Sequence, residues 1–172
     1  SGGIYGANKI PFSENSFVQA KGNLGYYLSS KLCAEILVGN YSDFFQTHIA
    51  RPFFIYGDRQ DCSMLIPRLV SSVENSKAIS LQGKEGIRIN PIHVSDAARA
   101  LNLIINYNGD LPHINIAGDQ VLSLRQIAKT IGMIIGKNPI FDPQASKAND
   151  VIGDITLLES LGMSFELGFE EN

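Results

Sequence analysis

The spacing of apolar side chains alternates between a helical and an extended period along the chain. Over residues 24–40 a leucine or isoleucine recurs every four positions, from Leu24 to Ile36, which is the period of one helix face. Residues 47–56 are rich in β-branched and aromatic side chains, so they predict one continuous buried strand. Paired apolar positions predict a second helix over residues 64–75.

Shorter elements follow in the second half of the chain. Strands are predicted over residues 78–81, 87–89, 91–94, 113–116 and 139–141, and helices over residues 95–106, 123–136 and 155–161. Ser95 or its neighbour is the expected cap of the first of these helices, and Ser123 is the expected cap of the second. Residues 142–150 are expected to form a loop. Because strands and helices alternate, the sequence predicts an α/β fold.

Composition narrows the class of protein. Apolar residues make up 44% of the chain and charged residues 18%, a balance typical of a folded globular domain. The formal net charge of -3 gives no basic field, so neither nucleic acid nor a membrane surface is an expected partner. No apolar run approaches the roughly 18 residues of a membrane span. Cys33 and Cys62 stand in no paired ligand spacing, so we expect no metal, no disulfide and a cytoplasmic location.

Tyr27 and Lys31 are the first candidates for chemistry. They lie four residues apart in the predicted helix of residues 24–40, so they share one face and are separated by one turn. A nearby ammonium favours the phenolate form of a tyrosine, which could then exchange a proton with a substrate hydroxyl or carbonyl. The alternative is a surface pair without function, because helices carry such pairs by chance.

Further motifs surround this pair in a fixed order. Ser1 opens a Ser-x3-Tyr-Gly pattern that ends at Gly6, ahead of the Tyr-x3-Lys pair. Segment 51–57 reads RPFFIYG, and segment 86–96 reads GIRINPIHVSD. Together these motifs resemble the extended short-chain dehydrogenase/reductases, the nucleotide-sugar epimerase and dehydratase group. Segments near the C-terminus of the chain also resemble the last elements of this family, so the resemblance covers essentially the whole chain.

The resemblance implies a catalytic group and a cofactor. Ser1 would hydrogen-bond the reacting oxygen, and Tyr27 would be the general acid or base. Lys31 would hold the nicotinamide ribose and favour the ionised tyrosine. The hydride would come from NAD or NADP, and the substrate would be a small molecule, a nucleotide sugar by resemblance.

Two further segments receive roles in the same way. The backbone of Pro52, Phe53 and Phe54 would lie near the nicotinamide ring. Arg88 would contact the diphosphate of a nucleotide sugar, a task suited to a guanidinium group. The alternative for Arg88 is a solvated side chain at a strand edge. For Arg51 there are two interpretations: a buried ion pair, or a residue that supports the site.

Asp96, by contrast, is interpreted as structural, because a carboxylate in the first turn of a helix is favoured by the free N–H groups there.

Two departures from the family pattern narrow the reaction. The 4,6-dehydratases of this family carry an acidic pair where this chain has Gly2 and Gly3, so dehydration is disfavoured and epimerisation or carbonyl reduction remain. Phe54 replaces an asparagine that contacts the substrate diphosphate in many nucleotide-sugar enzymes. A phenyl ring cannot donate that hydrogen bond, which leaves a non-nucleotide carbonyl compound as the alternative substrate.

The glycine-rich turn that receives the cofactor pyrophosphate in this family is not in the sequence. We therefore expect the C-terminal part of a doubly wound, Rossmann-like parallel sheet with a smaller α/β substrate-binding lobe. Residues 1–62 would be a remnant of the dinucleotide-binding domain, and residues 63–172 mainly the substrate-binding lobe, with residues 91–106 returning to the Rossmann part. Such a chain alone is expected to be inactive, a catalytically silent fragment being a further alternative, and the enzyme to be a homodimer.

Overall fold

Parallel strand pairs packed against helices make up most of the fold. The computed structural model describes residues 1–18, 24–111 and 113–169. Its helices are the 3-10 helix η1 (Gly2–Tyr5) and the α-helices α1 (Gly25–Gly39), α2 (Leu65–Glu74), α3 (Val94–Ile105), α4 (Leu124–Ile135) and α5 (Thr156–Ser160). Its strands are β1 (Ile49–Pro52), β2 (Ile55–Tyr56), β3 (Ile79–Gln82), β4 (Arg88–Ile89), β5 (Ile92–His93), β6 (His113–Ile116), β7 (Leu122–Ser123) and β8 (Phe141–Gln144).

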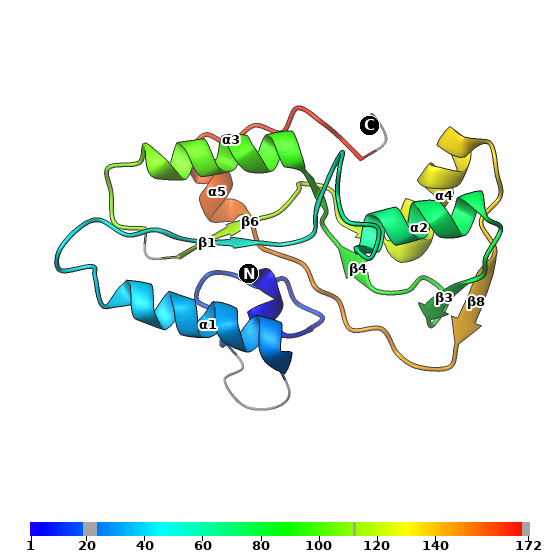
Figure 1. Ribbon diagram of the computed structural model, residues 1–172, viewed down its shortest axis with the longest axis horizontal. Helices are drawn as coiled ribbons and strands as arrows, with labels where there is room; N and C mark the ends of the chain where they lie inside the picture. The colour runs from blue at the N-terminus through cyan, green and yellow to red at the C-terminus, as the bar shows by residue number, and fades with distance from the viewer. Residues whose placement is uncertain (19–23, 112, 170–172) are drawn as a thin grey trace.

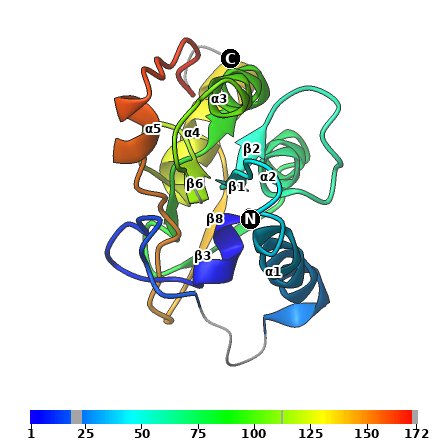
Figure 2. The ribbon, with the colours of Figure 1, turned by 90° about the vertical axis from the view of Figure 1, so that its left-hand side faces the viewer.

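One half of the molecule has three layers. β1 pairs in parallel with β6, so that Ile49 lies opposite His113 and Pro52 opposite Ile116. Figure 1 shows this pair between α3 on one side and α1 on the other, and Figure 2 shows the same order from the side. The buried cluster on the α3 side includes Ile104 from α3 and Leu158 from α5. The α/β fold predicted from the sequence is therefore confirmed.

The other half packs two helices on short strands. β3 pairs in parallel with β8, β4 pairs antiparallel with β7, and α2 and α4 lie beside them (Figure 1). The apolar stripes of the helices, with Leu69 and Val73 on α2 and Ile127 and Ile131 on α4, meet in one buried cluster. The boundary between domains expected after residue 62 stays a prediction.

The single strand predicted over residues 47–56 is wrong, because the chain changes partners in the middle of it. β1 follows β6 up to the point where the Phe53 amide donates to the Ile116 carbonyl at 2.8 Å. The next carbonyl, that of Phe54, accepts instead from the Ile92 amide at 3.1 Å, and β2 then pairs in parallel with β5. The break therefore comes from a switch between neighbouring strands.

Two smaller predictions also need correction. The cap of α3 is His93 rather than Ser95, because the Nδ1 atom of His93 accepts the Ser95 amide at 3.3 Å. The last strand covers Phe141–Gln144 rather than residues 139–141, so residues 142–144 are not loop. Pro143 is tolerated there because, among the described residues, β8 pairs with β3 on one side only, and the free edge of a strand needs no N–H donor.

α4 begins and ends where its sequence signals stand. The Ser123 hydroxyl accepts the Gln126 amide at 3.2 Å, and the Gln126 side chain accepts the Ser123 amide at 2.8 Å, which completes a capping box. Gly136 ends the helix in the left-handed conformation, with φ of 73°. Both predicted ends of this helix are confirmed. Within the described ranges, no helix is long and apolar enough to cross a membrane.

Replacing the capping serine should destabilise the protein. Ser123→Ala removes an acceptor for the amide of Gln126, so we expect a loss of about 1 kcal/mol in the free energy of unfolding. Chemical denaturation of both proteins measures this difference in the free energy of unfolding. Ser146→Ala, at an exposed position, is the control and should leave stability unchanged. Equal midpoints for the two variants would contradict the role of the cap.

Candidate functional site

A cavity of about 600 Å³ opens between α1, the first residues of the chain and the β1–β2 segment. Six of the seven residues assigned to the site from the sequence line it: Ser1, Tyr27, Lys31, Pro52, Phe53 and Phe54. The remaining lining residues are Gly3, Ala50, Ile55, Gln60, Met64, Leu65, Ile66 and Val151. Residues far apart in sequence therefore meet around one space of a size that suits a small molecule.

Tyr27 and Lys31 both reach this space from α1. The Lys31 ammonium lies 5.4 Å from the centre of the Tyr27 ring, as expected for side chains one turn apart. Tyr27 is 61% exposed and Lys31 is also exposed, so the phenol and the ammonium are open to a ligand. This pair can offer one O–H and one cationic N–H group to the same bound molecule.

The segment that carries Ser1 is closely packed. A methyl group at Gly2 would lie 2.6 Å from the Phe53 ring, and one at Gly3 would lie 2.9 Å from the side chain of Leu28. Ser1 itself is half-buried and lines the cavity. The glycine at position 2 therefore allows the segment to pack closely against the buried Phe53 ring, whereas a side chain at position 3 would require Leu28 to shift.

Phe53 and Phe54 have different surroundings although both line the cavity. The Phe53 ring is 4% exposed, is stacked 6.1 Å from the Tyr5 ring and also covers Gly153, where a methyl group would lie 2.8 Å from it. Phe54 is half-buried and packs both against the cluster formed by α2 and α4 and against a smaller cluster that contains Tyr5 and Phe53. The wall formed here is apolar, and it lies where β1 gives way to β2.

Arg88 does not line the cavity. Its guanidinium donates to Asp150 Oδ2 at 2.6 and 2.9 Å, and its backbone amide donates to Asp150 Oδ1 at 2.9 Å. Burial alone would raise the pKa of the Asp150 carboxyl, but these hydrogen bonds hold it below its ordinary value. Val151, the next residue, does line the cavity, so the Arg88–Asp150 pair adjoins the site without entering it.

A buried ion pair lies beneath the Tyr27 face of α1. Arg51 donates to Glu35 Oε2 through Nε at 3.1 Å and through Nη2 at 2.8 Å. Of the two interpretations of Arg51, the buried ion pair is therefore present. Sequence reasoning missed Glu35, although its position four residues after Lys31 places it on the same helix face.

Asp96 is buried in the first turn of α3, where the sequence placed it as a structural group. Its carboxylate pairs with Arg99 at 3.4 Å and accepts the backbone amides of Glu166 and Leu167 at 3.3 Å. These contacts tie the C-terminal segment to α3. Asp96 is not among the cavity residues.

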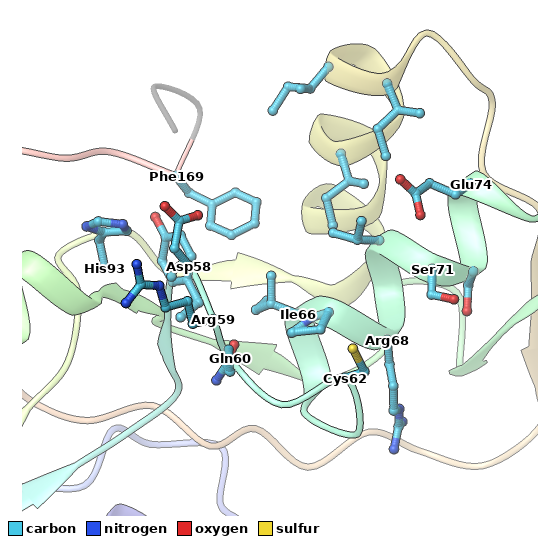
Figure 3. Close-up of a pocket in the computed structure, with 18 of the residues that line it drawn as sticks. Asp58, Arg59, Gln60, Cys62, Ile66, Arg68, Ser71, Glu74, His93 and Phe169 are labelled. Atoms are coloured by element: carbon cyan, nitrogen blue, oxygen red, sulfur yellow. The ribbon is translucent and has the colours of Figure 1, made fainter.

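A larger cavity of about 890 Å³ lies between α2, α4 and the loop of residues 57–62 (Figure 3). Asp58, Arg59, Arg68 and Glu74 line it together with Phe169 and a row of isoleucines. None of the seven residues assigned to the site lies there, although Gln60 and Ile66 line both cavities. Across the described parts of the chain, no group of three or more His, Cys, Asp or Glu side chains could hold a metal ion.

Proteins similar in sequence act on nucleotide sugars. A dTDP-4-dehydro-6-deoxy-D-allose reductase from Streptomyces sp is 29% identical over 64% of this chain and 36% of its own length. A GDP-6-deoxy-D-talose 4-dehydrogenase from Aggregatibacter actinomycetemcomitans is 30% identical over 73% of this chain and 42% of its own length. The chain thus spans less than half the length of either relative.

Solved structures match the fold over nearly the whole chain. A UDP-glucuronic acid 4-epimerase from Bacillus cereus, solved in complex with NAD, superimposes with a TM-score of 0.81 at 22% identity. The match covers 98% of this chain and 53% of that protein. The model of the NAD dependent epimerase/dehydratase family matches residues 1–117. The chain therefore belongs to the NAD-dependent epimerase/dehydratase family, as its motifs predicted.

Proposed function

We propose that the enzyme containing this chain transfers a hydride between NAD(P) and a carbon of a nucleotide sugar, as a sugar ketoreductase or a 4-epimerase. The main observation in support is that Ser1, Tyr27 and Lys31 line one cavity together with Pro52, the last residue of β1. Because all three side chains offer hydrogen-bond donors, the cavity is built to bind an oxygen and to move a proton. The reductase and dehydrogenase activities of the relatives favour this class of reaction.

Each residue has a separate task in this proposal. In carbonyl reduction the Tyr27 hydroxyl donates its proton to the substrate oxygen, and in alcohol oxidation the phenolate takes that proton back. Ser1 donates a hydrogen bond to the same oxygen and orients it. Lys31 binds the ribose hydroxyls of the cofactor, and its exposed ammonium on the Tyr27 face fits that role. The cofactor, when bound, supplies or accepts the hydride.

Elimination of water is not part of the proposal. An elimination needs a positioned acid to protonate the leaving hydroxyl. Gly2 and Gly3 supply none, and a side chain at Gly2 would overlap the Phe53 ring. The reaction is accordingly limited to reduction, oxidation or epimerisation.

Phe54 supports an alternative substrate. This phenyl group forms part of the apolar cavity wall, and the guanidinium of Arg88 is already bound by Asp150. A carbonyl compound without a nucleotide would need neither residue as a phosphate ligand. A nucleoside diphosphate should compete with the substrate if that substrate is a nucleotide sugar, and should not compete if it is a compound without a nucleotide.

A second copy of the enzyme is the proposed partner. α1 exposes large apolar side chains beside the catalytic pair, with Tyr26 at 92%, Leu37 at 66% and Ile36 at 62% exposure. Large apolar side chains exposed on a helix are stabilised when another helix covers them. A homodimer that buries this face, acting in the cytoplasm, is consistent with the proposal.

Removing the Tyr27 hydroxyl tests the catalytic assignment. Tyr27→Phe leaves the ring in place and removes the proton donor, so kcat should fall on the order of 10²- to 10⁴-fold with cofactor binding retained. Tyr26→Phe, at the neighbouring exposed position, is the matched control and should keep full activity. Steady-state kinetics of sugar-nucleotide reduction measure both. Full activity in Tyr27→Phe would refute the proposed mechanism.

Substitution of Arg88 separates the two classes of substrate. If the guanidinium contacts a diphosphate, Arg88→Met should raise KM for a nucleotide sugar on the order of tenfold and leave kcat nearly unchanged. A small keto compound without phosphate should show no such change. Arg125→Met is the control, because Arg125 packs on Phe141 away from the cavity. An unchanged KM for the nucleotide sugar would remove Arg88 from the binding site.

A further inference from the structure

Glu35 continues the row formed by Tyr27 and Lys31. The three residues are spaced four apart on α1 and so lie one above another along a single helix face. Unlike the other two, Glu35 points into the protein, and its side chain is only 9% exposed. The face of α1 that carries the proposed catalytic pair is thus anchored at its far end by a buried charge.

Glu35 joins α1 to the strand that ends at the cavity. One carboxylate oxygen accepts two hydrogen bonds from Arg51, whose side chain is 5% exposed. Arg51 belongs to β1 and directly precedes Pro52. The second oxygen lies 3.6 Å from the backbone nitrogen of Ser1. A single side chain on α1 therefore lies next to two other segments that line the cavity, β1 and the N-terminal segment.

Arg51 is fixed from its opposite side as well. Its Nη1 atom donates to the Tyr5 hydroxyl at 2.7 Å, and that hydroxyl donates to Asn115 Oδ1 at 3.1 Å. Burial alone would lower the pKa of the guanidinium, but the hydrogen bonds with Glu35 and Tyr5 hold it above its ordinary value, so the charge persists. The ion pair cannot shift without disturbing β1, β6 and the N-terminal segment together.

We propose that Glu35 and Arg51 are positioning residues, which set the distance of Tyr27 and Lys31 from Ser1 and from the end of β1. This inference rests on the proposed function, because it assumes that Tyr27 reacts. We call the Glu35–Arg51 ion pair the tether. Since Tyr27 and Lys31 share α1, loss of the tether should move them together relative to the substrate. The chemical step should slow, whereas substrate affinity, which depends on other walls of the cavity, should be kept.

Asp96 provides a matched comparison within the same chain. It is likewise a buried carboxylate bound to an arginine, but it lies on α3 and does not line the cavity. Asp96→Asn should therefore lower stability without changing turnover per folded molecule. A purely structural Glu35 would behave in the same way as Asp96.

The test compares Glu35→Gln, Arg51→Lys and Asp96→Asn in the complete enzyme, with active sites counted by cofactor binding. Both tether variants should lose on the order of tenfold or more in kcat per active site, with KM changed by less than about twofold. The double variant should be no slower than the slower single variant, because both substitutions disrupt the same contact between Glu35 and Arg51. Unchanged kcat in the tether variants, or failure of both to fold, would assign the pair to stability alone and overturn the inference.

Two further measurements separate this inference from the proposed function. Amide hydrogen exchange over α1 should speed up in Glu35→Gln and stay unchanged in Asp96→Asn, whether or not a substrate is known. Tyr27→Phe serves as the reference for chemistry. If Tyr27→Phe is inactive and the tether variants are fully active, only the positioning role fails. If Tyr27→Phe is fully active, the proposed function itself fails.

Discussion

A charge buried away from water needs partners, and Arg51 finds them in Glu35 and Tyr5, which belong to two different elements. An unpaired guanidinium in the interior would cost several kcal/mol, so each of its neighbours is held in place by the same requirement. Glu35 brings α1, Tyr5 brings the N-terminal segment, and Asn115 extends the chain of hydrogen bonds to β6. Because the side chains of Arg51 and Glu35 are almost inaccessible to solvent, water cannot replace any of these contacts. These contacts connect α1, the N-terminal segment and β1, three of the segments beside the cavity.

The strand switch next to Arg51 determines where the cavity opens. β1 belongs to the layered half of the molecule, and β2 pairs with β5, which leads directly into α3. Phe53 and Phe54 occupy the transition. The Phe53 ring belongs to the small cluster around Tyr5, and Phe54 packs against that cluster and against the cluster of α2 and α4. The cavity is lined by residues from both halves of the molecule. That position is typical of sites at the ends of parallel strands.

The sequence predicted those features that depend on neighbouring residues. Ser123 and Gly136 are local signals, and α4 begins and ends at them. The family motifs selected six residues that line one cavity, because a motif preserves a spatial relation that spacing alone does not reveal. The break at Phe53 escaped prediction because it depends on β5 and β6, which lie far along the chain. Glu35 and Asp150 escaped for the same reason, since each matters through an arginine distant in sequence.

The Phe53 ring fills the space between Gly2 and Gly153, two residues from opposite ends of the chain. An ancestor or descendant with an acid at position 2 would need a smaller residue at position 53, and that change would in turn leave a void beside Gly153. Either substitution made alone would overpack this space or leave it partly empty, and so would lower the stability of the protein. The size of the residue at position 2 is thereby linked, through the Phe53 ring, to the packing around Gly153.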